Sequence, residues 1–319
     1  MSSPKADPSG TCSTDMGTAE SRHSFQGRPI GAGRTHSATD IGVVVVTFQS
    51  ARTIRRCLDL LLASDPVVRI VVIDNASDDG TIDLLRDFAE RHDQVTVVRN
   101  SDNRGFAAAC NQGASALATP WVAFVNPDCY VESGALDRLV RHGVQRAGAG
   151  MLGVDLVDEY GHADPASRRR DPSLRELLDR RGRRDDLYLG RDPNAVLQPV
   201  EAISGALMLM PVGLFLQLGG FDESFRMHVE DLDLCRRTRD AGYEVLVAND
   251  ITVLHVGGES SRARPFWVER QKHISLWRYF RKFEAQQTES WLKPVLWLGL
   301  WGHFVVSSAR VLLRRSHQA

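Results

Sequence analysis

The sequence has few cysteines, little net charge and no secretory signal, and each shortage excludes a class of protein. Five cysteines are scattered without a CxxC pair: Cys12, Cys57, Cys110, Cys129 and Cys235. An odd number of unpaired cysteines indicates a reducing compartment, so we expect five free thiols that act as small buried side chains. The formal net charge of -1 gives no general reason to expect a nucleic-acid partner.

The first 39 residues also lack an apolar segment. Residues 1–39 are rich in Ser, Gly, Thr, Asp and Arg. Such a segment offers too little apolar surface to offset the entropy lost on ordering. We therefore expect a disordered tail and not a signal peptide.

Two common phosphate-binding loops are missing as well. A dinucleotide-binding unit needs GxGxxG directly after its first strand, but here the first strand is followed by Thr47-Phe48-Gln49-Ser50-Ala51. No P-loop motif is present either. A nucleotide would have to be held by other groups.

Strand and helix patterns alternate from Ile41 onward. Runs of mostly apolar residues fall at 41–46, 69–73, 95–98 and 121–125, and the first, a β-branched run, is typical of a strand that is buried on both faces. Helical patterns separate them, at 54–62, 81–88 and 105–117. This alternation predicts an α/β fold with a doubly wound sheet.

Polar side chains follow each of the four predicted strands. They are Thr47, Asp74 with Asn75, Asn103, and Asn126 with Asp128. Ligands of doubly wound sheets bind at the carboxyl ends of the strands. The pattern therefore predicts a nucleotide site there.

The second half of the chain has a different character. Residues 162–199 are charged and contain Pro, which predicts a mobile surface insertion. Order is expected to return at 203–210, followed by a turn at 219–222 and a helix that opens at Glu230. Two short predicted strands, 245–247 and 251–254, lead to His255.

Acids from both halves of the chain suit a metal site and a general base. Asn126-Pro127-Asp128 fits a site where Mg²⁺ or Mn²⁺ binds one carboxylate and a substrate diphosphate. Glu230, Asp231 and Asp233 open a helix, whose dipole favours ionised acids. One of these acids can take the proton of an acceptor hydroxyl.

With these motifs in order, the chain resembles the family 2 inverting glycosyltransferases, and within them a bacterial rhamnosyltransferase branch. The resemblance covers about residues 41–285. It rests on Val45-Val46-Thr47-Phe48, Val72-Ile73-Asp74-Asn75-Ala76-Ser77-Asp78-Asp79-Gly80-Thr81, Asn103-Arg104-Gly105-Phe106-Ala107 with Asn111 and Gly113, Asn126-Pro127-Asp128, Gly205-Ala206-Leu207-Met208, Gly219-Gly220-Phe221-Asp222, Glu230-Asp231-Leu232-Asp233-Leu234 and Leu254-His255. It implies a GT-A fold, a mixed sheet with a Rossmann-like nucleotide-binding half and an acceptor-binding half.

The resemblance also implies roles for residues. Nucleotide-sugar contacts fall to Thr47, Asp74, Asn75, Asn103, Gly105 and Asn126, with Asp74 on the pyrimidine base. Asp128 and His255 would hold the metal, and Asp231 would be the catalytic base, with Glu230 beside it. The family more often has an acid where this chain has Asn126, so metal affinity is expected to be lower.

Simpler interpretations exist for several of these residues. Asp128 could cap a helix that begins near Glu132, and Glu230 or Asp233 could be the base. His255 could be a hydrogen-bonded core histidine. Asp78 and Asp79 are expected to be solvated, as are the Arg clusters at 168–184, which could alternatively guide an anionic acceptor.

The C-terminal region, residues 263–319, is predicted to be a helical extension beyond a catalytic domain at 40–262. Residues 291–306 are apolar and rich in Trp, but interrupted and too short to span a bilayer, and Arg310, Arg314 and Arg315 follow. This pattern favours a helix that lies in the interface of an anionic membrane. Packing on the catalytic domain or on a second subunit in a homodimer is the alternative.

The predicted activity is transfer of a sugar, L-rhamnose from dTDP-rhamnose, to a lipid-linked or cell-envelope saccharide. The expected location is the cytoplasmic face of a bacterial plasma membrane. UDP-galactofuranose, UDP-glucose and GDP-mannose remain alternative donors. A non-catalytic sugar-nucleotide-binding scaffold is the alternative from another class.

Overall fold

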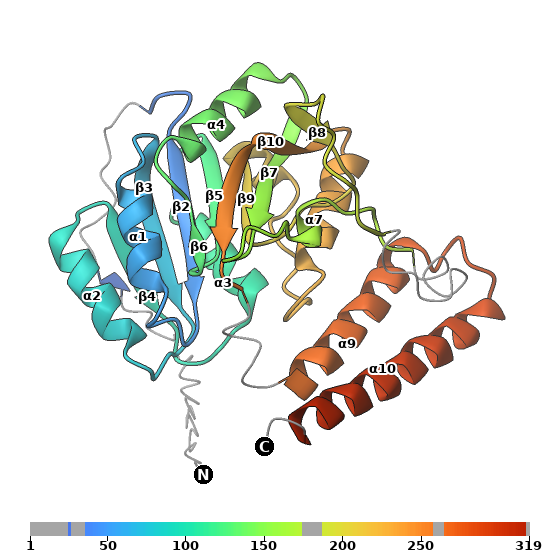
Figure 1. Cartoon of the computed structure of the whole chain (residues 1–319). Coiled ribbons are helices and arrows are strands. Elements are labelled where there is room, and N and C mark those ends of the chain that lie inside the picture. Colours follow the sequence, from blue (N-terminus) through green and yellow to red (C-terminus); the bar gives the residue numbers. More distant parts are fainter. Residues whose placement is uncertain (1–24, 27–35, 174–186, 258–264, 317–319) are drawn as a thin grey trace, which may run out of the picture.

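The computed structural model describes residues 25–26, 36–173, 187–257 and 265–316. One ten-stranded mixed sheet forms its centre, in the order β1-β4-β3-β2-β5-β9-β7-β10-β6, with β8 beside β10 (Figure 1). The strands are β1 Phe25–Gln26, β2 Ile41–Thr47, β3 Val67–Asp74, β4 Val95–Arg99, β5 Trp121–Val125, β6 Cys129–Tyr130, β7 Ala149–Val157, β8 Leu197–Pro199, β9 Leu207–Pro211 and β10 Glu244–His255.

The first half of the sheet is parallel, as the sequence predicts. Strands β4, β3, β2 and β5 pair side by side in parallel register. The intervening helices are α1 Ile54–Leu62, α2 Thr81–Arg91 and α3 Phe106–Ala114, and α4 Ala135–Gln145 follows β6. These four strands and their three crossover helices confirm the predicted α/β alternation.

Both faces of the parallel strands are buried, because successive side chains point to opposite faces. Val43 and Val45 pack with α1, α2 and α4 on one face. Val44 and Val46 pack with α3 on the other face, together with α6 Val212–Gln217 and α7 Glu230–Asp240. Hence the predicted strands consist of continuous apolar runs and do not alternate with polar residues.

The second half of the sheet is mixed and was predicted only in part. β9 runs antiparallel to β5 and β7, whereas β7 and β10 are parallel. The predicted pair of short strands is wrong, because β10 is one strand whose register with β7 shifts between Ala248 and Thr252. β7 was not predicted, and α4 was foreseen only as a helix that begins near Glu132.

The N-terminal tail and the insertion contain more structure than expected. β1 pairs antiparallel with β4, so the prediction of a disordered tail is wrong at Phe25–Gln26. Most of the remaining tail, residues 1–24 and 27–35, lies outside the described residues. In the insertion, residues 162–173 and 187–199 are described and include a 3-10 turn, Pro165–Ser167, and β8.

Two antiparallel helices, α9 Pro265–Phe283 and α10 Leu292–Ser316, form a hairpin beside the sheet domain (Figure 1). Phe280 of α9 packs against Leu296 and Leu300 of α10. Among the described residues, no helix combines the length and apolar character needed to cross a bilayer.

The cysteines match their prediction where they can be seen. Cys57, Cys110, Cys129 and Cys235 are all buried free thiols. Cys12 lies outside the described residues.

Candidate active site

A cavity of about 620 Å³ lies at the carboxyl ends of the parallel strands. Since β2 pairs with β3 on one side and β5 on the other, the strand order reverses at β2, which is where such sheets bind ligands. The cavity walls come from both halves of the chain. They include Phe48, Ser50, Asn75, Asn103, Gly105, Asn126, Asp128, Asp164, Arg169, Gly205, Arg226, His228, Glu230, Asp231, His255 and Trp267.

Thr47 and Asp74 lie behind this wall and do not line the cavity. Both are fully buried, and Thr47 Oγ1 donates to Asp74 Oδ1 at 2.9 Å. Ser77 adds two more bonds to the Asp74 carboxylate, from its hydroxyl at 2.6 Å and its backbone N–H at 3.0 Å. This burial does not fit the predicted contact with the base, and it makes Asp74 the anchor of the loop after β3.

Asn75 occupies the place in the wall that the sequence analysis gave to Asp74. Its amide nitrogen donates to the Gly105 carbonyl at 3.2 Å, and its oxygen accepts from Asn100 at 2.9 Å. Asn103 lines the same side, and its side-chain oxygen accepts from the Gly105 N–H at 3.0 Å. A Cβ on Gly105 would lie 2.8 Å from the Arg226 carbonyl, so the loop requires glycine there.

Asp128 and His255 meet where β10 ends beside β6. His255 Nε2 lies 3.5 Å from Asp128 Oδ1, and Nδ1 lies 3.7 Å from Asp164 Oδ2. Burial alone would lower the pKa of His255, but the two carboxylates outweigh it and raise the pKa to about 9. The imidazolium therefore bridges two acids, of which Asp164 was not predicted. Asn126 lines the cavity next to Asp128.

The residues at this corner fit a divalent cation. Ligand atoms of Asp128, Cys129 and His255 lie within 4.8 Å of one another. Burial raises the pKa of the Cys129 thiol well above its usual range, and nearby Asp128 adds to this effect. A neutral buried thiol is a poor ligand for a hard cation, which leaves Asp128, with Asp164 close by, and His255 once its imidazolium releases a proton on metal binding.

Two of the three acids in the first turn of α7 line the cavity, and the three differ in environment. Asp231 Oδ2 accepts from Arg169 and from the Gly205 N–H at 3.2 Å, and Oδ1 accepts from the Leu232 N–H at 2.8 Å. Burial opposes ionisation of Asp231, but Arg169 and these N–H groups hold its pKa below the usual range.

Glu230 titrates in the opposite direction. Burial and the neighbouring Asp231 charge raise the pKa of Glu230 to about 8, and no described residue bonds its Oε2. Asp233 is fully buried between Arg237 and Lys282. Of the three acids, only Asp231 is an ionised carboxylate that lines the cavity.

The backbone before α7 is strained. His228 and Val229 have φ of 62° and 76°, which is uncommon for residues other than glycine. Such strain persists only where the surroundings hold it, and it gathers at functional sites. Here it turns Glu230 and Asp231 into the cavity.

Arg168 and Arg169 are not solvated, so that prediction is wrong for both of them. Arg168 is buried and donates to Asp155 at 2.8 Å and to Asn249 at 2.6 Å. Arg169 reaches Asp231. Part of the predicted Arg cluster, residues 174–186, lies outside the described residues.

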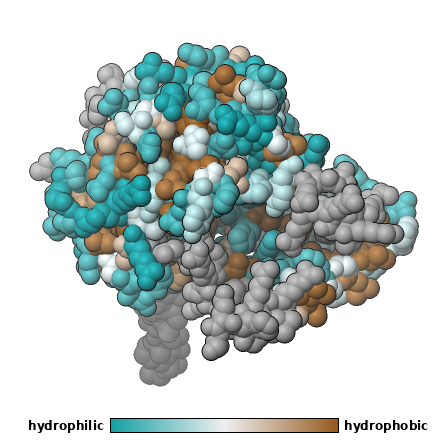
Figure 2. All heavy atoms as spheres, in the orientation of Figure 1, coloured by the Kyte–Doolittle hydropathy of each residue, from teal (hydrophilic) through white to brown (hydrophobic). Residues whose placement is uncertain are grey.

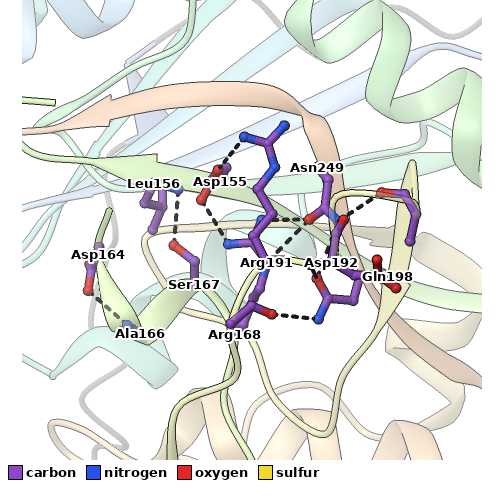
Figure 3. A network of polar contacts seen from close by, with 12 residues as sticks. Asp155, Leu156, Asp164, Ala166, Ser167, Arg168, Arg191, Asp192, Gln198 and Asn249 are labelled. Carbon is purple, nitrogen blue, oxygen red and sulfur yellow. Dashed lines mark hydrogen bonds and ion pairs between the residues drawn. The ribbon is translucent and has the colours of Figure 1, made fainter. Parts of the chain in front are cut away.

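A polar network holds the loop that carries Asp164 and Arg169 (Figure 3). Ser167 Oγ accepts from the Leu156 N–H at 3.0 Å, and Asp164 Oδ1 accepts from the Ala166 N–H at 2.9 Å. Asn249 in turn donates to the Asp192 carbonyl at 3.0 Å. The insertion is thus joined to β7 and β10, and it supplies Asp164 and Arg169 to the cavity lining.

The family model described as "Glycosyl transferase family 2" matches residues 42–192. An N-acetylglucosaminyl-diphospho-decaprenol L-rhamnosyltransferase of Mycobacterium tuberculosis is 27% identical over 300 residues, which are 86% of this chain and 95% of the relative.

Two solved structures share the fold. A mannosyltransferase from Pyrobaculum calidifontis, in complex with GDP-Man and Mn²⁺, has a TM-score of 0.53 and 19% identity over 88% of this chain and 75% of its own. GalNAc-T7, with UDP, GalNAc and Mn²⁺, has a TM-score of 0.54 and 18% identity over 68% and 43%. These likenesses confirm the predicted GT-A type of mixed sheet.

Proposed function

Because the chain belongs to glycosyl transferase family 2, we propose that it is an inverting transferase that moves L-rhamnose from dTDP-L-rhamnose to a lipid-linked saccharide. The mycobacterial L-rhamnosyltransferase supports this donor and acceptor class, because its likeness extends over nearly the whole of both chains. The cavity is large enough for a nucleotide sugar and opens between the two halves of the sheet.

The nucleotide end of the donor would lie against Asn75, Asn103 and Gly105. Asn75 is an amide and can both accept from and donate to a base, so it favours no one pyrimidine. The buried Thr47–Asp74 pair would hold this wall in place and would not touch the donor.

The diphosphate end would lie near Asp128, His255 and Asn126. Asp128 and His255 would hold Mg²⁺ or Mn²⁺, which supplies positive charge against the departing diphosphate. Asn126 is uncharged and can accept from a ribose hydroxyl.

Asp231 would act as the base. It takes the proton of the acceptor hydroxyl, whose oxygen bonds to the anomeric carbon on the face opposite the diphosphate. The bond from that carbon to the diphosphate breaks, so the configuration inverts. Glu230 is protonated at neutral pH and would donate to a sugar oxygen.

One observation carries this proposal: an ionised Asp231 and the Asp128–His255 pair line a single cavity. The substitution Asp231→Asn tests it. We expect the variant to be stabilised by donor against heat as the wild type is, while transfer falls by about 10²–10⁴-fold.

Glu230→Gln is the matched neighbour. It keeps an uncharged hydrogen-bonding group and should retain far more activity than Asp231→Asn. Wild-type transfer by an Asp231→Asn protein that still binds donor would rule out the base.

The donor is tested separately. Thermal stabilisation by dTDP-L-rhamnose should exceed that by UDP-galactofuranose, UDP-glucose and GDP-mannose. A different order would reassign the donor with the same chemistry. Tight donor binding without turnover on any acceptor would favour a non-catalytic scaffold, although a scaffold has no need of an ionised Asp231.

The α9–α10 hairpin would contact the inner face of the plasma membrane, where a lipid-linked acceptor is presented. Along α10, apolar side chains are exposed at Val295, Trp297, Leu298, Val305 and Val306, and the exposed Trp291 immediately precedes the helix. Figure 2 shows apolar side chains gathered on this hairpin. A Trp-containing apolar helix face with basic residues after it is typical of interfacial binding, which flotation with lipid vesicles measures.

A further inference from the structure

The α9–α10 hairpin brings together three side chains that the active site does not use. Glu269 and His273 lie four residues apart on α9, so they share one face of the helix. His303 faces them from α10. In the described part of the chain, this is the second group, besides that at Asp128, whose potential ligand atoms all lie within 4.8 Å of one another.

The hydrogen bonds of His273 show which of its ring nitrogens carries the hydrogen and which has a free lone pair. His273 Nδ1 lies 2.8 Å from the Glu269 carbonyl oxygen, and a carbonyl can only accept, so Nδ1 carries the hydrogen. The lone pair of the neutral ring is then on Nε2, which lies 3.0 Å from His303 Nδ1. Histidines that ligate metals usually have this second bond from the other ring nitrogen to a carbonyl or carboxylate.

The third group is an anion. Glu269 Oε1 lies 3.7 Å from His273 Nδ1. Glu269 is partly exposed to solvent, and a glutamate in contact with water is ionised at neutral pH. A carboxylate is therefore available beside the two imidazoles.

We propose that Glu269, His273 and His303 form a binding site for a transition-metal cation, Zn²⁺ by ligand preference, separate from the catalytic cation site. Two imidazoles and one carboxylate suit Zn²⁺, whereas Mg²⁺ prefers oxygen ligands. Tetrahedral Zn²⁺ with bonds of about 2.0–2.1 Å holds two nitrogens about 3.3 Å apart. The two ring nitrogens at 3.0 Å need to separate only slightly.

Binding of the cation moves one hydrogen and leaves the number of protons on the two histidines unchanged. Without metal, His303 Nδ1 donates its hydrogen to His273 Nε2. When the cation takes both nitrogens, that hydrogen moves to His303 Nε2, and His303 is exposed to solvent for the exchange. Water fills the fourth position.

The site connects the hairpin to the active site. Trp267 and Val268, which immediately precede Glu269, line the catalytic cavity. A cation that ties the start of α9 to α10 would therefore also fix this wall.

Zn²⁺ titration of the metal-stripped full chain by calorimetry tests the proposal, with Co²⁺ absorption as the report of tetrahedral geometry. We expect one site of micromolar affinity, a visible Co²⁺ band, and a melting temperature that rises with Zn²⁺. His303→Ala should weaken Zn²⁺ binding at least tenfold and abolish the band. Because His303 is exposed, this variant should fold, which circular dichroism checks.

Two control variants locate the cation. Asp128→Asn removes the catalytic cation site, and His162→Ala removes another exposed histidine next to an acid. Zn²⁺ binding and the Co²⁺ band should survive in both. Binding that is unchanged in His303→Ala, or lost in Asp128→Asn, would overturn the hairpin site without bearing on sugar transfer.

Discussion

At the scale of single residues, the pair of Arg169 and Asp231 sets the protonation of the candidate base. Arg169 stabilises the Asp231 carboxylate and lowers its pKa although burial opposes this. A base with a lowered pKa remains ionised in mildly acidic solution. The wild-type protein, which has Arg169, should therefore remain active in mildly acidic solution.

Replacing Arg169 should move the acid limb of the pH profile. In Arg169→Gln the pKa of Asp231 rises, so the acid limb of kcat/KM shifts to higher pH by about one unit or more. Arg169→Lys keeps the charge and should shift the limb less. Profiles measured from pH 4.5 to 9 decide the point, and equal shifts in both variants would contradict a charge effect.

Glu230 makes the stability of the fold depend on pH, because its pKa is raised on folding whereas that of Asp231 is lowered. The pKa of Glu230 is raised to about 8 in the folded chain from the ordinary glutamate value of 4.5. Between these values the folded state holds a proton that the unfolded state has lost, so stability falls as pH rises. Above pH 8 the folded chain carries a buried carboxylate beside Asp231.

Glu230→Gln should remove this dependence. We expect the variant to melt about 2 °C or more above the wild type at pH 9 and close to it at pH 5. Calorimetric scans across this range measure the difference. Parallel melting curves at all pH values would mean that Glu230 is ionised throughout.

Single residues also mark how far the sequence could predict the site. It predicted that Asp128, Glu230, Asp231 and His255 converge, because each lies at the end of a recognisable element. It could not decide between Asp74 and Asn75, since neighbours at a strand end point in opposite directions.

Two further site residues had no local signal. Arg169 is paired with Asp231 across 62 residues of chain, and Asp164 meets His255 in the same way. Only the folded chain brings these side chains together.

At the scale of elements, continuous apolar runs predicted strands correctly, whereas segments that mix apolar residues with Gly and Asp did not reveal theirs. The first four predicted strands are mostly apolar runs that are buried on both faces of the sheet. β7 includes Gly150, Gly153 and Asp155, and no periodic pattern identifies it. A Cβ on Gly150 would lie 2.5 Å from Tyr243, so packing explains a glycine that propensity counts against a strand.

The insertion was predicted to be mobile because its charges suggested solvent. Some of its charged side chains instead form buried contacts within the protein. Arg168 is buried against Asp155 and Asn249 and joins the loop to β7 and β10.

Loss of Arg168 should therefore be costly. Among the described residues, Arg168→Met leaves Asp155 with only the more distant Arg191, 3.8 Å away, and the substitution should destabilise the fold by about 3 kcal/mol. Arg170→Met, at the exposed neighbour, should cost less than about 0.5 kcal/mol. Urea unfolding compares them. Adding Asp155→Asn to Arg168→Met should restore part of the lost stability, because it removes the buried carboxylate that has lost its partner. A further loss of stability would contradict this explanation.

At the scale of the whole molecule, α9 joins the catalytic domain to α10. Lys282 bonds Asp222 at 2.7 Å and Asp233 at 2.6 Å, and Ser275 donates to the Met227 carbonyl at 3.1 Å. These bonds hold α9 beside the strained segment before α7. The exposed face of α10 thus has a fixed orientation to the cavity.

Leu298 and Leu216 offer a matched test of the membrane proposal, because both are 63% exposed, one on α10 and the other on α6. Burying a leucine in an apolar phase is worth about 1.5–3 kcal/mol. Leu298→Ser should therefore reduce binding to anionic vesicles about tenfold or more, whereas Leu216→Ser should leave binding unchanged. Flotation measures both variants, and higher salt should weaken binding if the basic C-terminal residues contribute. Equal losses in the two variants would mean that α10 does not lie in the membrane, and its apolar face would then suit a second subunit.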